Sequence, residues 1–490
     1  MSALAFFQVP YFSGIGAVDY IRLLPELVLT AFGMAVMIVE PLLPEHNDRK
    51  GLGVLALIGA LLAIAATLVQ TGYQGKAWFG MVQVDAFSIF FHLIIGFVAA
   101  TVILASYEYM AVQRLRAGEY YGLILLGAVG MMLMSAAIEL VLIFIALEIS
   151  SISTYILAGF RRRAATSIES SLKYFLLGSF ATAFFLYGVA LMFGATGSTS
   201  IYAIAASLHG GANTLAYAGM AMMFVGLGFK VASAPFHVWT PDVYEGAPAP
   251  VVALMSTAPK AAAFAVLLRV LFAAAAPGWF WVVWCSAVLS MCIGNIGALV
   301  QNNVKRMLAY SSIAHAGYLL VAFAAAKQLG ISAAIFYAAA YAAMNVGAFI
   351  VISHFASHGE RYVNMDDYAG LGRRAPGLAA VLTVFLLSLI GIPITGGFFA
   401  KFYVFSAALK SDLVGLVIIG LINSAIAAYY YLRVIVMMYM REPKEEAPMM
   451  PMPKTVGVSL AAAVVATIYL GVLPGRVLEY ALQGARDLLK

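Results

Sequence analysis

The chain has 490 residues, of which 63% are hydrophobic and only 10% charged, and its mean hydropathy is +0.96. This balance excludes a water-soluble globular domain, because soluble proteins carry about 25% charged residues. Neither G-x-x-x-x-G-K-[ST] nor G-x-G-x-x-G occurs, so the sequence offers no usual nucleotide-binding loop. The two cysteines, Cys285 and Cys292, form no C-x-x-C pair, and we therefore predict no iron–sulfur centre in this chain.

Long apolar runs follow one another along nearly the whole chain. A membrane-spanning helix needs about 20 mostly apolar residues, and the runs do not alternate apolar and polar positions as barrel strands do. We therefore predict an all-α polytopic membrane protein with about fourteen transmembrane helices. The predicted spans are 21–43, 51–70, 84–107, 120–137, 140–160, 168–194, 213–238, 248–276, 279–302, 307–326, 331–356, 376–409, 413–440 and 454–474.

The distribution of basic residues predicts the orientation of these spans. Fifteen lysines and arginines lie in loops after odd-numbered spans, and only Lys76, Lys327 and Lys410 lie in loops after even-numbered spans. Cytoplasmic loops are the ones enriched in lysine and arginine, so we place the odd loops in the cytoplasm and both termini in the periplasm. The fifteen are Arg49, Lys50, Arg114, Arg116, Arg161, Arg162, Arg163, Lys305, Arg306, Arg361, Arg373, Arg374, Arg441, Lys444 and Lys454.

The segments between the spans leave no room for a domain outside the membrane. The longest hydrophilic stretches are 357–376 and 440–455, and residues 197–212 predict a short helix lying along the outer interface. The first 26 residues lack a basic n-region and a small-residue cleavage site, so no signal peptide is predicted. The expected organisation is a single membrane domain, residues 1–490.

Helix breakers lie at comparable depth in two predicted spans. Pro235 follows Lys230 by five residues in the seventh, and Pro393 precedes Lys401 in the twelfth together with two glycines. Proline and glycine release backbone carbonyls, which a membrane tolerates only against protein or a wet cavity.

The two broken spans are five spans apart and therefore cross the membrane in opposite directions. This arrangement is typical of inverted repeats, whose discontinuous helices flank a mid-membrane ion site. We expect a first repeat over residues 120–276 (helices four to eight) and a second over 279–440 (helices nine to thirteen).

Four ionisable residues, Glu148, Lys230, Lys260 and Lys401, lie inside apolar runs. A charge at the bilayer centre costs at least about 2.5–3.5 kcal/mol, so such residues usually face a protein interior and serve a function. Burial disfavours a charged ammonium, and a nearby carboxylate favours it. Glu148 is the expected partner of Lys230, and separation of the two would favour loss of the proton from the lysine. Alternatively, the lysines bind freed carbonyls or extend toward an interface, and Glu148 anchors one helix to another.

Further titratable residues have alternative or unassigned roles. His315 is either a hydrogen-bonded core histidine or a relay between Lys260 and Lys401, aided by Tyr318, Tyr337 and Tyr341. His237 is expected to fix a turn, Glu139 to be interfacial, and Lys173 to pair with Glu169 in solvent. Asp85, His92, His354, Arg269 and Arg433 are candidates without an assigned role.

Three strings of the sequence carry a family resemblance. They are FVGLGFKVASAPFHVWTPDVYEGAPAPVVALMSTAPKAAAF (224–264), VKRMLAYSSIAHAGY (304–318) and IGIPITGGFFAKFYVF (390–405). They closely resemble the proton-translocating antiporter-like subunits of respiratory complex I. PDVYEGAP with STAPK is similar to the subunit N family, the bacterial counterpart of mitochondrial NADH dehydrogenase subunit 2. The resemblance covers essentially the whole chain.

Two features separate this family from its relatives. Subunits L and M and the multisubunit sodium/proton antiporters lack PDVYEGAP, and subunit M typically has glutamate where Lys401 stands. The cyanobacterial and plastid relative shares PDVYEGAP and is the closest alternative within complex I. A sodium/proton antiporter subunit is the alternative transporter, and a structural membrane scaffold is the third hypothesis.

The resemblance implies a role for five residues. Glu148 matches the fifth-helix glutamate of the family, Lys230 and Lys401 the lysines of its broken seventh and twelfth helices, Lys260 its central lysine, and His315 its tenth-helix histidine. It also implies proton transfer from the cytoplasm through these residues to the periplasm, driven by quinone reduction elsewhere in the complex.

The resemblance also implies the surroundings of the chain. The expected location is the bacterial inner membrane, the expected partners are the lipid bilayer and subunits M, L, K, J and A, and no nucleic acid is expected. No cofactor is expected in this chain, while NADH, FMN, iron–sulfur clusters and quinone are expected in other subunits of an NADH:quinone oxidoreductase.

Overall fold

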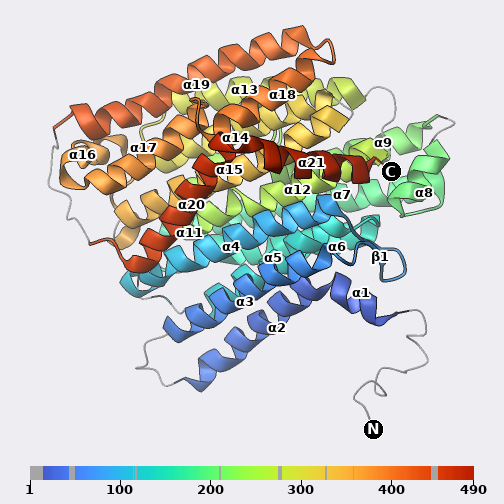
Figure 1. Cartoon of the computed structure of the whole chain (residues 1–490), viewed down its shortest axis with the longest axis horizontal. Helices are drawn as coiled ribbons and strands as arrows, with labels where there is room; N and C mark the ends of the chain where they lie inside the picture. Colours follow the sequence, from blue (N-terminus) through green and yellow to red (C-terminus); the bar gives the residue numbers. More distant parts are fainter. Residues whose placement is uncertain are drawn as a thin grey trace.

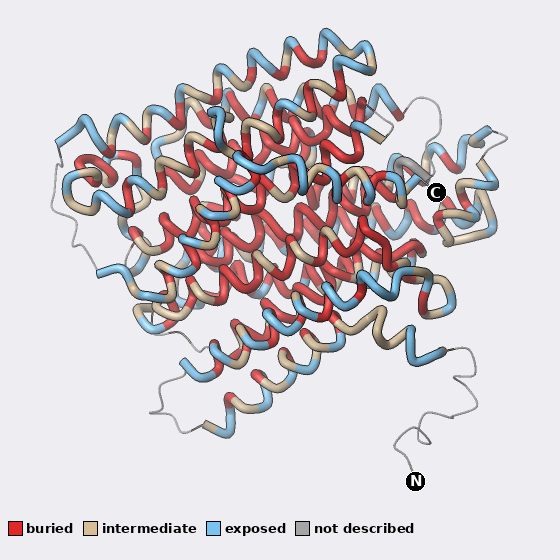
Figure 2. Tube along the Cα trace, in the orientation of Figure 1, coloured by how far each residue is buried: buried red, intermediate tan, exposed pale blue. Residues whose placement is uncertain are grey.

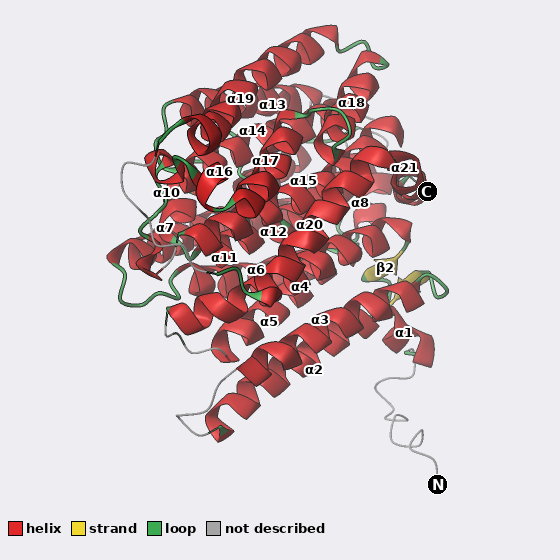
Figure 3. Cartoon of the chain, turned by 60° about the vertical axis from the view of Figure 1, so that its left-hand side comes forward, coloured by secondary structure: helices red, strands yellow, loops and turns green. Residues whose placement is uncertain are grey.

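The structure is a computed structural model that describes residues 15–43, 50–113, 115, 118–208, 211–273, 279–325, 328–356, 358–442 and 451–489. Arg49, Arg114, Arg116, Lys327 and Lys444, which contribute to the predicted orientation, lie outside these residues, as does most of the segment in which no signal peptide is predicted. The described chain is almost entirely helical, with one small hairpin near its first third (Figure 3).

The helices and strands follow one another in this order along the chain. The first are α1 (Ala17–Arg22), α2 (Leu24–Val39), η3 (Glu40–Leu42), α3 (Lys50–Gln70), β1 (Gly75–Ala77), β2 (Val82–Val84), α4 (Ala86–Val112), α5 (Gly118–Ala136), α6 (Leu140–Ala158), α7 (Ala165–Thr196), α8 (Ile201–Leu208), α9 (Thr214–Val231), α10 (Thr240–Gly246), α11 (Ala249–Met255), α12 (Ala258–Ala273) and α13 (Trp279–Leu299). They continue with α14 (Val304–Ala324), α15 (Gln328–Phe355), η4 (His358–Glu360), η5 (Met365–Tyr368), α16 (Leu371–Arg374), α17 (Pro376–Ile390), α18 (Gly396–Leu409), α19 (Val414–Met440), α20 (Lys454–Val472) and α21 (Pro474–Leu488).

The predicted spans are confirmed in number and order. Among the described residues, 13 helical segments are long and apolar enough to cross a membrane, and the shorter apolar helices α17 and α18 together occupy the predicted twelfth span. The predicted interfacial segment contains α8, and the breaks predicted after Lys230 and before Lys401 are both present, between α9 and α10 and between α17 and α18.

The predicted eighth span, 248–276, is present as Ala249–Val270, but its helix is interrupted. The structure divides it into α11 and α12 at Ser256 and Thr257. Pro259 has no N–H to donate to the carbonyl of Met255 four residues earlier. The Tyr244 hydroxyl donates to that carbonyl instead, over 3.4 Å. Residues 274–276 of the predicted span lie outside the described residues.

The helices form one bundle whose centre is buried on all sides. In Figure 1, α2 and α3 lie along one edge and α19 along the opposite edge, while α12, α14 and α15 lie between them. The most apolar stretches of these three central helices are 94–100% buried, against 33–44% for α2, α3 and α19. Figure 2 shows the same contrast, with buried residues concentrated in the middle of the bundle. The central helices are therefore shielded from lipid and can carry polar groups.

Glu360 ties several helices together at one end of the bundle. Its carboxylate accepts hydrogen bonds from Lys305 Nζ (2.8 Å), Tyr109 Oη (2.8 Å) and the Ala249 amide (2.7 Å), and it forms an ion pair with Arg161. Lys305, which the sequence assigns to a loop, is in fact buried at the start of α14. Burial alone would raise the pKa of Glu360, but Lys305 and Arg161 hold it below its usual range.

We expect Glu360→Gln to destabilise the protein by about 3–5 kcal/mol at neutral pH, because it leaves Lys305 buried without a counter-charge. A carboxylate whose pKa is depressed by folding stabilises above its unfolded-state pKa, and this stabilisation is lost as the pH falls through its folded-state pKa. The deficit of the variant should therefore shrink on acidification. Thermal melting of the purified complex as a function of pH measures this effect, with the exposed Glu442→Gln as control. A deficit that does not depend on pH would contradict this account.

Candidate functional site

Lys401 lies buried beside the break in the twelfth span, on the second turn of α18. Its Nζ donates to the carbonyls of Leu389 (3.1 Å) and Ile390 (2.8 Å) and to Ser424 Oγ (2.9 Å). Pro393 lacks the N–H that would otherwise bond the Leu389 carbonyl. The sequence allows Lys401 either a role in proton transfer or a structural role as a donor to freed carbonyls. Its hydrogen bonds show that it does bind freed carbonyls.

The two halves of this broken span touch closely. The Gly397 amide donates to Ser388 Oγ over 3.1 Å, and a Cβ atom at position 397 would overlap the Ser388 carbonyl oxygen. Glycine is therefore required here for close approach of the backbone. This contact fixes the start of α18 against the end of α17 and places Lys401 opposite the released carbonyls.

Lys260 lies just after the break between α11 and α12 and is 3% exposed. Its Nζ donates to the carbonyl (3.0 Å) and to the hydroxyl of Ser312 on α14. The Tyr341 hydroxyl donates to the same Ser312 hydroxyl over 2.7 Å. The ammonium group therefore has neutral partners and no carboxylate beside it among the described ion pairs.

His315 lies one turn beyond Ser312 on α14, and both of its ring nitrogens meet tyrosines. Nδ1 is 2.7 Å from the Tyr337 hydroxyl and Nε2 is 3.3 Å from the Tyr431 hydroxyl. Tyr431 in turn is hydrogen-bonded to Ser311. Because a hydroxyl can donate or accept, this histidine can exchange a proton with either neighbour.

A small cavity joins the two groups. It has a volume of about 10 Å³ and is lined by Lys260, Ser312, His315 and Tyr341, among other residues. A polar cavity needs about 10–15 Å³ to hold one water molecule. The space between the Lys260 ammonium and the His315 ring is therefore near the size of a single bridging water.

Lys230 and Glu148 lie on neighbouring helices but form no ion pair in the described part of the chain. Lys230 Nζ donates to Ser151 Oγ over 2.9 Å, and Ser151 is three residues after Glu148 on α6. Glu148 Oε1 is buried without a hydrogen-bond partner. The carboxylate is thus one helical turn from the hydroxyl that holds Lys230, and the expected direct pair is absent.

The structure brings some of the five sequence-predicted residues close to one another and leaves others apart. Lys260 and His315 share a cavity, and Lys401 lies 5.0 Å from the ring centroid of Tyr318, whose ring packs edge-on against His315 at 5.6 Å. Lys230 is joined by no hydrogen bond to any of the other four in the described part of the chain.

Comparison with known proteins identifies the family. Residues 137–427 match the family described as NADH:quinone oxidoreductase/Mrp antiporter, TM. NADH-quinone oxidoreductase subunit N 2 of Koribacter versatilis (strain Ellin345) is 66% identical over 485 residues, which cover 97% of this chain and 99% of the relative. The chain belongs to the subunit N family of NADH-quinone oxidoreductase.

Two further comparisons agree with this family. NADH-quinone oxidoreductase subunit N 1 of Solibacter usitatus (strain Ellin6076) is 47% identical and covers 96% of this chain and 98% of its own length. A chain of respiratory complex I from Thermus thermophilus, solved with bound aureothin, is 38% identical with a TM-score of 0.81, covering 93% of this chain and 98% of that one. Subunit N is an antiporter-like membrane subunit of complex I, a translocase.

Several hydroxyl groups of this subunit N site are not predicted from the sequence. Ser151, Ser312 and Ser424 each accept a hydrogen bond from one of the three lysines, and Tyr431 contacts His315. Serine is common in transmembrane helices, where its hydroxyl often bonds the carbonyl four residues earlier. No local pattern distinguishes these serines, because their partners are 23 to 79 residues away in the chain.

The remaining candidates have structural contacts in this subunit. Glu139 caps α6 by accepting from the Leu142 amide, and Lys173 pairs with Glu169 and Asp242 at 2.7 Å each. The predicted pairing of Lys173 with Glu169 is thus present. His237 lies in the turn between α9 and α10, where burial lowers its pKa.

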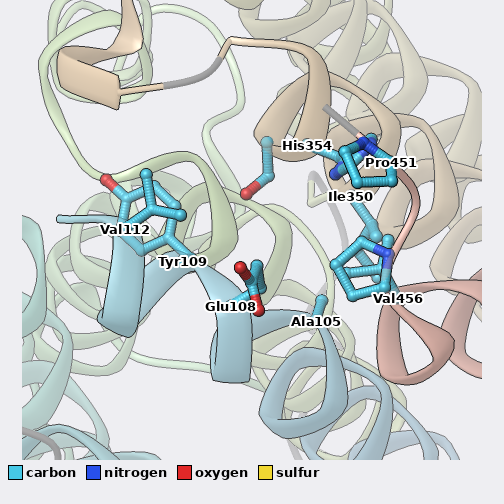
Figure 4. Close-up of a pocket in the computed structure, with 10 residues that line it drawn as sticks. Ala105, Glu108, Tyr109, Val112, Ile350, His354, Pro451 and Val456 are labelled. Carbon is cyan, nitrogen blue, oxygen red and sulfur yellow. The ribbon is translucent and has the colours of Figure 1, made fainter. Parts of the chain in front are cut away.

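A second cavity lies apart from the lysines, where α4 and α15 end and the segment before α20 begins (Figure 4). It has a volume of about 110 Å³, and Glu108, His354, Pro451 and Val456 are among its lining residues. None of the five site residues lines it. It therefore belongs to the end of the bundle at which Glu360 lies, since Tyr109 borders the cavity and donates to Glu360.

We expect Lys401→Met to lower the stability of subunit N in addition to any effect on turnover. The substitution leaves the carbonyls of Leu389 and Ile390 without their donor, at a cost of about 1–3 kcal/mol for each buried unsatisfied group. Thermal dissociation of this subunit from the purified complex measures the change. Phe402→Met, at an exposed neighbouring position, is the matched control. An unchanged melting temperature for Lys401→Met would show that these carbonyls find other donors.

Proposed function

We propose that this chain translocates protons from the cytoplasm to the periplasm along a buried row of Glu148, Lys230, Lys260, His315 and Lys401. Quinone reduction in other subunits of the complex supplies the energy. The observation that carries the proposal is that three lysines are buried near helix breaks and held by neutral hydroxyls and carbonyls. Ammonium groups without a fixed counter-charge are poised to lose and regain a proton when the local charge changes.

The first step of the proposed path is uptake at Glu148 and Lys230. Ser151 holds the lysine and lies one turn from the glutamate. Because Glu148 Oε1 has no hydrogen-bond partner, the carboxylate can accept a proton or turn toward the lysine. Movement of a neighbouring subunit that changes the distance between Glu148 and Lys230 would then change the charge on Lys230.

The middle step is transfer between Lys260 and His315. Ser312 and Tyr341 provide hydroxyl groups beside the lysine, and the cavity between Lys260 and His315 provides space for about one water. The Tyr337 hydroxyl then connects His315 to α15, and the Tyr431 hydroxyl connects it to α19. Release follows through Lys401, which the Tyr318 ring separates from His315.

The arrangement of breaks supports the two proposed inverted repeats, 120–276 and 279–440. Lys230 ends the last turn of α9, before its break, whereas Lys401 follows the break between α17 and α18. Spans five apart in a polytopic chain run in opposite directions, so the two lysines occupy related positions on opposite sides of the proposed symmetry axis.

We further propose the setting of the subunit. It lies in the bacterial inner membrane with both termini periplasmic, beside the antiporter-like subunits M and L and the small subunits K, J and A. NADH, FMN, iron–sulfur clusters and quinone are bound by other subunits. Moving one proton against the membrane potential costs about 2.3 kcal/mol per 100 mV, which the redox reaction must supply.

We expect Lys260→Met to lower coupled NADH:quinone activity and proton pumping together by about tenfold or more, because positioned proton-transfer groups contribute about 10²–10⁴ in rate. Methionine keeps the length of the side chain but cannot carry a proton. The measurement uses the assembled complex in proteoliposomes, with native gel electrophoresis to verify assembly. Lys410→Met, an exposed lysine at the end of α18, is the control. Full pumping by a correctly assembled Lys260→Met complex would refute the central role, and loss of assembly alone would support the scaffold hypothesis.

A further inference from the structure

A second group of buried titratable residues lies outside the proposed repeats, among α2, α3, α4 and α5. These helices lie together on one side of the bundle (Figure 1). Glu26, on the first turn of α2, is 4% exposed, and His92, on the second turn of α4, is fully buried. His92 Nε2 is 3.6 Å from Glu26 Oε1. Neither residue takes part in the proposed row of lysines.

Both ring nitrogens of His92 lie beside hydrogen-bond acceptors. Nε2 lies 3.1 Å from the Met132 carbonyl, and Nδ1 lies 3.3 Å from Gln70 Oε1. The Gln70 amide is oriented by its other end, because Nε2 donates to the Arg22 carbonyl over 2.7 Å. Both ring nitrogens therefore face acceptors, whereas a neutral imidazole has one N–H. Only a protonated ring donates to both.

Glu26 is the counter-charge that such a ring requires. Neither of its carboxylate oxygens has a hydrogen-bond partner, although both are buried. A buried carboxylate without partners is costly unless it pairs with a cation or takes up a proton itself. A single proton therefore removes the unpaired charge, either by forming an imidazolium beside the carboxylate or by neutralising the carboxyl group.

Two arginines lie near the pair, and both have partners. Arg269, on α12, donates to both carboxylate oxygens of Asp85 at 2.9 and 3.0 Å. From the other neighbouring elements, α3 brings Gln70, α5 brings Ser135 and α21 brings Asp487, which accepts from the amide at the start of α4. On α1, the Arg22 guanidinium donates to carbonyls of residues 73, 74 and 76.

A continuous set of hydrogen bonds joins the pair to the helix of Lys260. The Ser135 hydroxyl donates to the same Met132 carbonyl that faces His92, over 2.8 Å. Arg269 Nε donates to the Ser135 carbonyl over 2.9 Å. Arg269 is nine residues after Lys260 on α12, so a displacement of α12 changes the position of a cation near His92.

We propose that Glu26 and His92 form a second proton-binding site of this chain, which holds one proton between them and releases it toward the end of the bundle where α2 begins. Upon release, the bond that holds the proton breaks, either Glu26 O–H or His92 N–H, and a neutral imidazole and a Glu26 carboxylate remain. The site lies about 10 Å from the start of α4, since a helix rises 1.5 Å per residue. That end is the one we assign to the periplasm. Proton binding by Glu26 and His92 does not depend on the proposed lysine row. Only the use of this site during turnover rests on the proposed function.

The test follows the carboxyl, carboxylate and imidazole vibrations of the resting complex by infrared spectroscopy during a pH titration. We expect a titration of the carboxyl or imidazole bands that disappears in Glu26→Gln and whose midpoint moves by about one pH unit or more in His92→Gln, since removal of a charge partner shifts such equilibria by this amount. Arg269→Gln should move the midpoint as well. Glu479→Gln, an exposed carboxylate on α21, should leave it unchanged.

The possible outcomes separate this proposal from the proposed function. A titration that persists unchanged in assembled Glu26→Gln complex would overturn the site. If Glu26→Gln does not assemble, the titration midpoints of His92→Gln and Arg269→Gln test the site instead. If both midpoints are unchanged, the site is also overturned. The titration is measured without electron transfer, so it does not depend on proton pumping. We therefore expect it to be unchanged in Lys260→Met, even if that variant shows that the lysine row does not translocate protons.

Discussion

The site of this protein depends on the absence of water around its backbone. A proline within a membrane helix leaves the carbonyl four residues earlier without a donor, and lipid supplies none. Here Pro259 frees the Met255 carbonyl, which Tyr244 binds, and Pro393 frees the Leu389 carbonyl, which Lys401 binds. The requirement to pair a released carbonyl thus places polar side chains at the membrane centre, and the fully buried position of the central helices makes those side chains tolerable.

Much of the fold could be predicted because lipid imposes length and apolarity on every span. All fourteen runs coincide with helices, including the interrupted twelfth, where Pro393 marks the break. The break in the eighth span could not be inferred from apolarity, since residues on both sides of it are equally apolar. Pro259 was the available local signal, and its effect depends on Tyr244, a residue of another helix whose position only the tertiary structure provides.

The candidate site was partly predictable for the same reason. A charge inside an apolar run is conspicuous in any sequence, so Lys230, Lys260, Lys401 and Glu148 could be found without a structure. Their immediate partners could not, because a serine on a distant helix costs little in lipid and leaves no pattern. Opposite charges predict an interaction of Glu148 with Lys230, and the structure adds Ser151, on the same helix as Glu148, as the hydrogen-bond partner of the lysine. Charge thus identifies such a site, and packing decides its contacts.

The contacts of Lys401 have a consequence for helix geometry. A protonated lysine has three hydrogens on Nζ, and here three acceptors receive them: two carbonyls at the end of α17 and the Ser424 hydroxyl of α19. A neutral amine has only two hydrogens. Each departure of a proton from Lys401 therefore either leaves a carbonyl at the end of α17 without a donor or reverses the hydrogen bond with Ser424, whose hydroxyl then donates to the neutral amine. The protonation state of Lys401 therefore changes the hydrogen bonds that join α17, α18 and α19. A proton transfer at this residue thus also changes the contacts between the three helices.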